Sequence, residues 1–122
     1  MVFYEPAARD RDLLPHDPFK AIVAPRPIGW ISTRTADGTT NLAPYSFFNA
    51  VGDRPPMVMF SSVGMKDTAS LALESGEFCW NLVSRDLAEL RNATSRSLPR
   101  GDDEAAATGP ELEPGRVTGA PR

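Results

Sequence analysis

Few residues of the kinds that build disulfide bonds, metal centres or catalytic triads occur in this chain. It has one cysteine, Cys79, and one histidine, His16, among 122 residues. A single cysteine excludes an intrachain disulfide, and one histidine without a cysteine pair makes a poor metal site even beside Asp17. The sequence also contains no Ser-His-Asp arrangement, no P-loop and no G-x-G-x-x-G loop. These absences argue against a metal site and against the common nucleophilic and nucleotide-binding motifs.

Long apolar runs and an excess of positive charge are also missing. No run approaches the roughly 18 apolar residues of a membrane span. Thirteen basic and sixteen acidic residues give a net charge of -3, which does not favour nucleic acid or an anionic membrane as a partner. The first residues, M-V-F-Y-E-P, lack the basic-then-apolar order of a secretory signal. We therefore expect no nucleic acid partner, no membrane partner and a cytoplasmic location.

The distribution of prolines indicates where the folded body lies. The chain has 12 prolines, concentrated in its first and last quarters, so the ends are expected to be irregular. Residues 101–122 contain only Leu112 and Val117 as large apolar side chains, which bury too little surface to offset the entropy lost on ordering. We expect residues 1–100 to form the domain and residues 101–122 to be a disordered or poorly packed tail.

Apolar alternation predicts strands over residues 28–33 and 40–43, joined by a turn at Asp37-Gly38. Pro44 is expected to end regular pairing there, because it has no N–H to donate. Extended structure is then expected to resume over residues 45–48.

A later strand, residues 57–60, is apolar at every position, so both of its faces are expected to be buried. Further on, Phe78, Trp80 and Leu82 alternate with other residues and are expected to share a core face.

Short helices are predicted between these strands. Asp17-Pro18 can open a helical turn, with Asp17 as the cap and Pro18 in the first helical position. A second helix is expected from a cap at Asp67 through Glu74, with Gly76 as its C-terminal stop. A third is expected from a cap at Ser84 over Arg85 to about Thr94. In the first turn, three apolar side chains are expected to point to the core: Phe19, Ile22 and Val23. Strands with short helices between them and no repeated βαβ unit predict a mainly β fold, as a small barrel or an α+β sheet.

A polar cluster follows the buried strand and opens the second helix: Ser61, Ser62, Lys66, Asp67 and Thr68. A helix start attracts phosphate, because it presents free N–H groups and a partial positive charge. Lys66 adds a full charge, and the hydroxyls add directional hydrogen bonds. The alternative is a capped helix beside a solvated lysine, and the spacing alone does not decide between the two.

A second candidate segment runs from Asn41 to Asn49, where Pro44, Ser46 and Asn49 interrupt an aromatic-rich strand. Backbone exposed at such breaks can hydrogen-bond the edge of a flat heterocycle. A β-bulge with aromatic core residues explains the same pattern. Arg26, between two prolines, could bind an anion, meet a second subunit or simply face solvent.

Five motifs in this order resemble the flavin reductase-like family of FMN-binding split-barrel proteins. They are A-P-R-P-I-G-W-I-S-T, N-L-A-P-Y-S-F-F-N, R-P-P-x-V-M-F-S-S, K-D-T and F-x-W-N-L-V-S, and they span roughly residues 16–100. The resemblance implies a mainly β fold with short helices, an FMN-binding split β-barrel. It also implies a homodimer with FMN at the subunit interface, and hydride transfer from NADH or NADPH to the flavin.

The resemblance also implies which residues hold the cofactor. Five match the segment that holds the flavin phosphate: Ser61, Ser62, Lys66, Asp67 and Thr68. Five match the segment beside the isoalloxazine ring and ribityl chain: Asn41, Ala43, Ser46, Phe48 and Asn49. Ser32 and Thr33 match a strand end near the flavin. No catalytic acid or base is expected, since the flavin itself accepts the hydride while the protein positions it.

The chain departs from the family pattern in two places. Ser70-Leu71 stands where an Arg-Asn pair is more usual, and Ala105 stands where an aromatic residue is usual. The resemblance further implies that the remaining barrel strands of related proteins are absent, so the barrel is expected to be incomplete. A non-catalytic flavin-binding module, or an inactive truncated fragment, is therefore the alternative to a flavin reductase.

Overall fold

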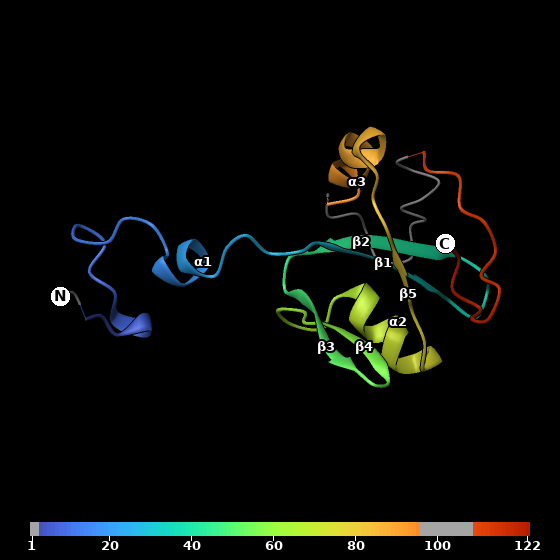
Figure 1. Cartoon of the computed structure of the whole chain (residues 1–122), viewed down its shortest axis with the longest axis horizontal. Coiled ribbons are helices and arrows are strands. Elements are labelled where there is room, and N and C mark those ends of the chain that lie inside the picture. Colours follow the sequence, from blue (N-terminus) through green and yellow to red (C-terminus); the bar gives the residue numbers. More distant parts are fainter. Residues whose placement is uncertain (1–2, 96–108) are drawn as a thin grey trace.

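The computed structural model describes residues 3–95 and 109–122. A body of short strands and helices carries an N-terminal segment that extends away from it (Figure 1). The strands are β1 (Gly29–Arg34), β2 (Thr40–Tyr45), β3 (Phe48–Asp53), β4 (Pro56–Phe60) and β5 (Cys79–Asn81). The α-helices are α1 (Pro18–Ile22), α2 (Asp67–Ser75) and α3 (Ala88–Ala93), with 3-10 turns η1 (Pro6–Ala8) and η2 (Arg85–Leu87).

Three of these strands form an antiparallel sheet in the order β2-β1-β5. The predicted turn between β1 and β2 is confirmed, because Gly38 has φ +96° and the Thr35 N–H donates to the Thr39 carbonyl at 2.9 Å. The prediction for Pro44 is wrong: β2 continues through it to Tyr45, and Pro44 lies opposite Trp30. Among the described strands β2 lies at an edge of this sheet, and an edge strand tolerates a residue without an N–H.

Strands β3 and β4 form a separate antiparallel hairpin with a bulge between Ala50 and Gly52. The sequence did not predict the length of β3. The expected burial of both faces of β4 is wrong, since Met57 and Met59 are each 48% exposed. The hairpin packs only one face on the core, through Phe48, Val58 and Phe60.

The core lies between the hairpin and the three-stranded sheet. Ile31, Tyr45 and Phe48 are its buried centre. The Phe60 ring lies between Tyr45, to which it is tilted, and Phe78, which it meets edge to face, at centroid distances of 4.9 and 5.1 Å. Gly29 is required here because a Cβ on it would lie 2.4 Å from Phe48 Cδ2.

The expected core face of the last strand is correct only for Phe78. Trp80 is half exposed and Leu82 is exposed, because β5 is three residues long and lies at the other edge of the described sheet.

The first two helices begin within one residue of the predicted start. The predicted third helix begins as the 3-10 turn η2 at Arg85, without a side-chain cap from Ser84, and becomes α-helical at Ala88. Asp17 caps α1 by accepting from the Phe19 N–H, as predicted, but Phe19, Ile22 and Val23 are exposed rather than in the core. Helix α1 lies outside the body (Figure 1), so its apolar side chains are not buried in the core, although the Phe19 ring contacts Phe47. Helix α2 ends as predicted at Gly76, with φ +73°, whereas Asp67 is its first helical residue rather than its cap.

The last residues return to the sheet. Ala120 and Pro121 are buried, and the Glu77 carboxylate accepts hydrogen bonds from the Gly119 and Ala120 N–H groups. The Ser32 hydroxyl donates to the Pro121 carbonyl. Residues 119–121 are therefore held against the sheet. Residues 101–108 of the expected tail lie outside the described residues, so the tail and its boundary at residue 100 stay predictions.

Across the described residues, no helix combines the length and the apolar character needed to cross a membrane.

Candidate functional site

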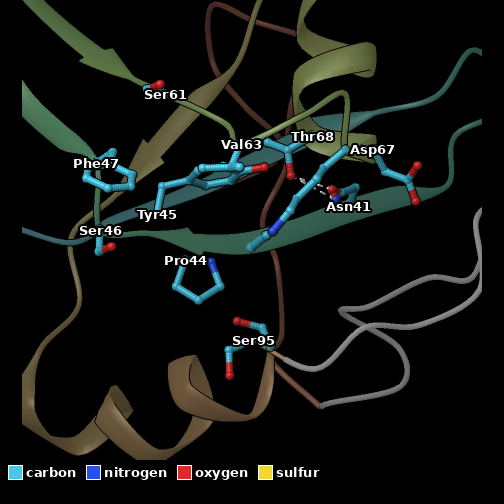
Figure 2. A pocket seen from close by; sticks show the side chains of 13 residues that line it. Asn41, Pro44, Tyr45, Ser46, Phe47, Ser61, Val63, Asp67, Thr68 and Ser95 are labelled. Carbon is cyan, nitrogen blue, oxygen red and sulfur yellow. Dashed lines mark hydrogen bonds between the residues drawn. The ribbon is translucent and has the colours of Figure 1, made fainter. Parts of the chain in front are cut away.

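A cavity of about 440 Å³ opens between β2, the start of α2 and the end of α3. Four stretches line it, and Figure 2 shows their side chains converging from separate elements. The lining residues are Asn41, Ala43, Pro44, Tyr45, Ser46, Phe47, Ser61, Val63, Lys66, Asp67, Thr68, Thr94 and Ser95. The volume lies within the roughly 300–1,000 Å³ of small-molecule and cofactor sites.

A buried pair of side chains joins β2 to α2 at one wall of this cavity. The Thr68 hydroxyl donates to Asn41 Oδ1 at 2.8 Å, and Asn41 Nδ2 approaches the same hydroxyl at 3.2 Å (Figure 2). Thr68 is 1% and Asn41 is 6% exposed. Because water reaches this pair poorly, the two hydrogen bonds fix the first turn of the helix against the strand.

The start of α2 supplies the positive potential of the cavity. Lys66 occupies the N-cap position without a side-chain cap hydrogen bond, so the helix start keeps donor capacity toward the cavity. Lys66 and Asp67 are the charged residues of the lining, and their formal charges cancel. The sign of the electrostatic potential at this end of the cavity is therefore set by the helix dipole and the free N–H groups of the first turn. Both favour an anion.

Aromatic side chains form the opposite end of the cavity. Tyr45 lies beside Val63, and Phe47 lies farther along, next to Ser46 (Figure 2). The outer side of Phe47 is held by the N-terminal segment: the Arg26 guanidinium lies 5.8 Å from its ring centroid and the Phe19 ring 6.3 Å. Aromatic walls beside polar groups suit a flat, partly apolar ligand.

The structure brings together seven of the twelve residues that the sequence singled out. They are Asn41, Ala43, Ser46, Ser61, Lys66, Asp67 and Thr68.

The other five do not line this cavity, for different local reasons. Phe48 is in the core, Asn49 is exposed and accepts from the Ala50 N–H, and the Ser62 hydroxyl donates to the Gly64 carbonyl.

Ser32 and Thr33 are fully buried on opposite faces of β1. Ser32 donates to the Pro121 carbonyl and accepts from Asn81 Nδ2 at 3.1 Å. Thr33 Oγ1 has no hydrogen-bond partner in the described structure, although Thr33 pairs directly with Asn41 across the sheet.

Six lining residues were not among the twelve predicted residues: Pro44, Tyr45 and Phe47, which lie within the predicted segment 41–49, and Val63, Thr94 and Ser95, which lie outside both predicted groups. Thr94 and Ser95 follow α3, and Ser95 lies on the far side of Pro44 from α2 (Figure 2). The Trp30 indole N–H donates to Thr94 Oγ1 at 2.9 Å, which ties the end of α3 to β1. A threonine after a short helix carries no sequence signal for a site, so only the tertiary arrangement reveals it.

Comparison with known proteins decides the family. The model of the flavin reductase like domain matches residues 23–122, which is most of the chain. The chain belongs to the flavin reductase-like family. An uncharacterized protein of Deinococcus radiodurans is 44% identical over 110 residues, and one of Aquifex aeolicus is 40% identical over 106 residues. Each alignment covers 83% of this chain, with 48% and 54% of the respective relative.

Solved structures of the family share this fold. The 2-nitrobenzoate 2-nitroreductase NbaA of Pseudomonas fluorescens is 34% identical, with a TM-score of 0.74 over 82% of this chain and 49% of that one. Nitrilotriacetate monooxygenase component B of Bacillus cereus is 26% identical, with a TM-score of 0.84 over 100% of this chain and 62% of that one. A Shewanella frigidimarina protein assigned as a flavin reductase with a split barrel domain gives 25% identity and a TM-score of 0.74, covering 80% and 49%.

These findings confirm the fold class. The chain is mainly β with short helices, and its two open sheets are consistent with part of a split barrel. It spans about half the length of the curated relatives it matches. Among the described residues, no group of three or more His, Cys, Asp or Glu side chains is arranged to hold a metal ion.

Proposed function

We propose that this flavin reductase-like chain binds FMN in the cavity between β2, α2 and α3 and serves as an NAD(P)H-dependent flavin reductase. The observation that carries the proposal is the junction of an anion-favouring helix start with an aromatic-walled cavity. Both belong to segments whose motifs resemble the cofactor-binding segments of the family. A phosphate at one end and a flat ring at the other are the two chemical features of FMN that such a cavity suits.

The residues present fit this cofactor. Lys66 and the N–H groups of the first turn of α2 would hold the phosphate. Ser61, whose N–H donates to the Phe47 carbonyl at 2.8 Å, would lie nearer the ring (Figure 2). Tyr45, Ser46 and Phe47 would flank the ring. The hydrogen bond between Thr68 and Asn41 would hold the phosphate-binding start of α2 in a fixed position against β2.

Bound flavin supplies hydride acceptance from NADH or NADPH, so the protein needs no acid or base of its own. The tasks left to this chain are to bind the phosphate, orient the ring and exclude water. Five predicted residues lie outside the cavity lining and would contribute to flavin binding only by stabilising the fold, not by contact with the flavin. They are Ser32, Thr33, Phe48, Asn49 and Ser62. We further propose a cytoplasmic homodimer.

Replacing Lys66 tests the assignment of the phosphate end. Loss of a charge-assisted hydrogen bond of about 1.5–3 kcal/mol corresponds to an FMN affinity roughly 10–150-fold weaker. We expect this result for Lys66→Ala by fluorescence titration of FMN, with a smaller loss for Lys66→Arg, which keeps the charge. Lys20→Ala, at the chain's only other lysine and outside the cavity, should bind FMN like the unaltered protein.

Anaerobic addition of NADH or NADPH to the FMN-loaded protein tests turnover separately. Bleaching of the visible flavin absorbance supports the reductase. Flavin binding without bleaching would favour the non-catalytic flavin-binding module, and absence of FMN binding would reject both. Unchanged FMN affinity in Lys66→Ala would contradict the placement of the phosphate.

A further inference from the structure

Arg26 is a charged side chain beside the flavin cavity to which the proposed function gives no task. It lies between Pro25 and Pro27 and is partly buried. Its Nη1 donates to the carbonyls of Lys20 and Val23 at 2.9 and 2.7 Å, so two backbone groups fix the direction of the guanidinium. The ion pairs found among the described residues do not include Arg26. Its charge is therefore held in one place, and no carboxylate of the described chain neutralises it.

This fixed guanidinium contacts the aromatic wall of the cavity. Its Cζ lies 5.8 Å from the centroid of the Phe47 ring, within the roughly 6 Å of a cation–π interaction. The Arg26 Nε is buried without a hydrogen-bond acceptor among the described residues, so the electron-rich ring face offsets part of the water that this group has lost. Phe19 lies against the same ring at 6.3 Å between centroids, and the Phe47 carbonyl accepts from the Ser61 N–H at 2.8 Å. Both the ring and the backbone of Phe47 are thus held, and Arg26 supplies the charged contact.

The flavin ring would lie beside a part of the cavity that has no charge of its own. The lining residues 43–47 are all uncharged, whereas the charged lining residues, Lys66 and Asp67, come from the start of α2. Arg26 is outside the lining, so its charge acts on a ligand across Phe47. An aromatic ring screens a charge much less than water does, because its dielectric constant is low. Arg26 is therefore placed to act on the ring end of the cavity without touching the ligand.

We propose that Arg26 is a positioning residue of this cavity: it fixes Phe47 and holds a positive charge that favours reduced over oxidised flavin. This inference rests on the flavin reductase function proposed above. A hydride carries two electrons and one proton, so its transfer oxidises NADH to NAD⁺, or NADPH to NADP⁺, and gives the flavin ring one negative charge. A fixed positive charge stabilises the ring after that transfer more than before it. Charges near the ring are among the means by which a protein tunes a flavin.

The reduction potential of the FMN-loaded full chain tests this role, because a side chain that only supports the fold would not shift it with charge. Arg26→Met keeps the apolar stem against Phe47 and removes the charge. Arg26→Gln also removes the charge but keeps a donor for the backbone carbonyls, so it replaces Arg26→Met if that variant does not fold by circular dichroism. In both variants the affinity for reduced FMN should fall about three- to tenfold more than that for oxidised FMN, the size expected of one partly screened charge. That difference lowers the two-electron potential by about 14–30 mV.

Two matched variants separate the charge from the position. Arg26→Lys keeps the charge without the fork of the guanidinium. Its potential should stay close to that of the unaltered protein, while oxidised FMN binds more weakly because Phe47 is held less firmly. Arg34→Met removes an exposed charge that also donates to a backbone carbonyl, that of Gly38, and that lies outside the cavity lining. It should change neither the potential nor the affinity for FMN.

A potential that falls in Arg26→Met and Arg26→Gln, but not in Arg26→Lys or Arg34→Met, supports the proposal. The same potential in Arg26→Met, Arg26→Gln and the unaltered protein would overturn it and leave the flavin reductase standing. An equal fall in Arg26→Lys would overturn it too, because the shift would then follow geometry and not charge. Failure of the unaltered chain to bind FMN gives no flavin signal in any sample, and it would reject the proposed function together with this inference.

Discussion

Replacing Thr68 with valine removes one hydroxyl from the pair that joins β2 to α2. Valine keeps the branched shape of threonine, so the packing around the site changes little. The change leaves the Asn41 amide, which is 6% exposed, without the hydroxyl that it contacts at 2.8 and 3.2 Å. The change in stability of Thr68→Val therefore reports the loss of a buried hydrogen bond and not the loss of side-chain volume.

A buried polar group that loses its partner destabilises the folded state by about 1–3 kcal/mol. Thr68 is 1% exposed, so water cannot easily replace the hydroxyl, and we expect a loss within this range. Replacing both partners, as Asn41→Val with Thr68→Val, removes the unsatisfied group as well. The coupling between the two positions should therefore be about 0.5–3 kcal/mol, with the double variant less destabilised than the sum of the single variants.

Urea unfolding of the two single variants, the double variant and Thr68→Ser measures this coupling. Serine keeps the hydroxyl and loses only a methyl group, so it should retain the interaction with Asn41. If Thr68→Val is no less stable than Thr68→Ser, or if the two valine substitutions are simply additive, the pair does not fix the helix to the strand and the reasoning is refuted.

Three further predictions concern turns and close contacts. Gly29→Ala would place a Cβ 2.4 Å from Phe48 Cδ2, and overpacking of this kind should cost about 1–3 kcal/mol in urea unfolding; an unchanged midpoint would show that the ring moves freely. Gly76→Ala forces a side chain at φ +73° and should lower stability by about 1–2 kcal/mol, unless α2 ends differently in solution. The Thr35 hydroxyl, the largest cause, holds the pKa of Asp37 below its usual value. The resulting stabilisation is present above the pKa of the unfolded chain and is lost as pH falls through the folded pKa. Melting curves of Asp37→Asn and the unaltered protein should therefore differ at neutral pH and converge in strong acid, and a difference independent of pH would contradict this.

Local signals in the sequence were reliable where a single residue decides the backbone. Gly38 marks the turn between β1 and β2, Gly76 ends α2, and Asp17 caps α1, all as predicted. Predictions of burial were less successful. Apolar side chains such as Ile22 and Met59 were expected to be buried and are exposed, because burial depends on which surface covers a segment. For α1 and the outer side of the hairpin, the described chain provides no such surface.

The sequence by itself determined the family, the class of the fold and the two segments that contribute most of the cavity lining. It could do so because a helix start, a turn glycine and a polar cluster act through neighbouring residues along the chain. Only the tertiary structure placed Thr94 and Ser95 in the cavity, paired Asn41 with Thr68, and moved Ser32, Phe48 and Asn49 out of the lining. Those outcomes depend on strand register and on contacts between residues far apart in sequence, which local patterns do not encode.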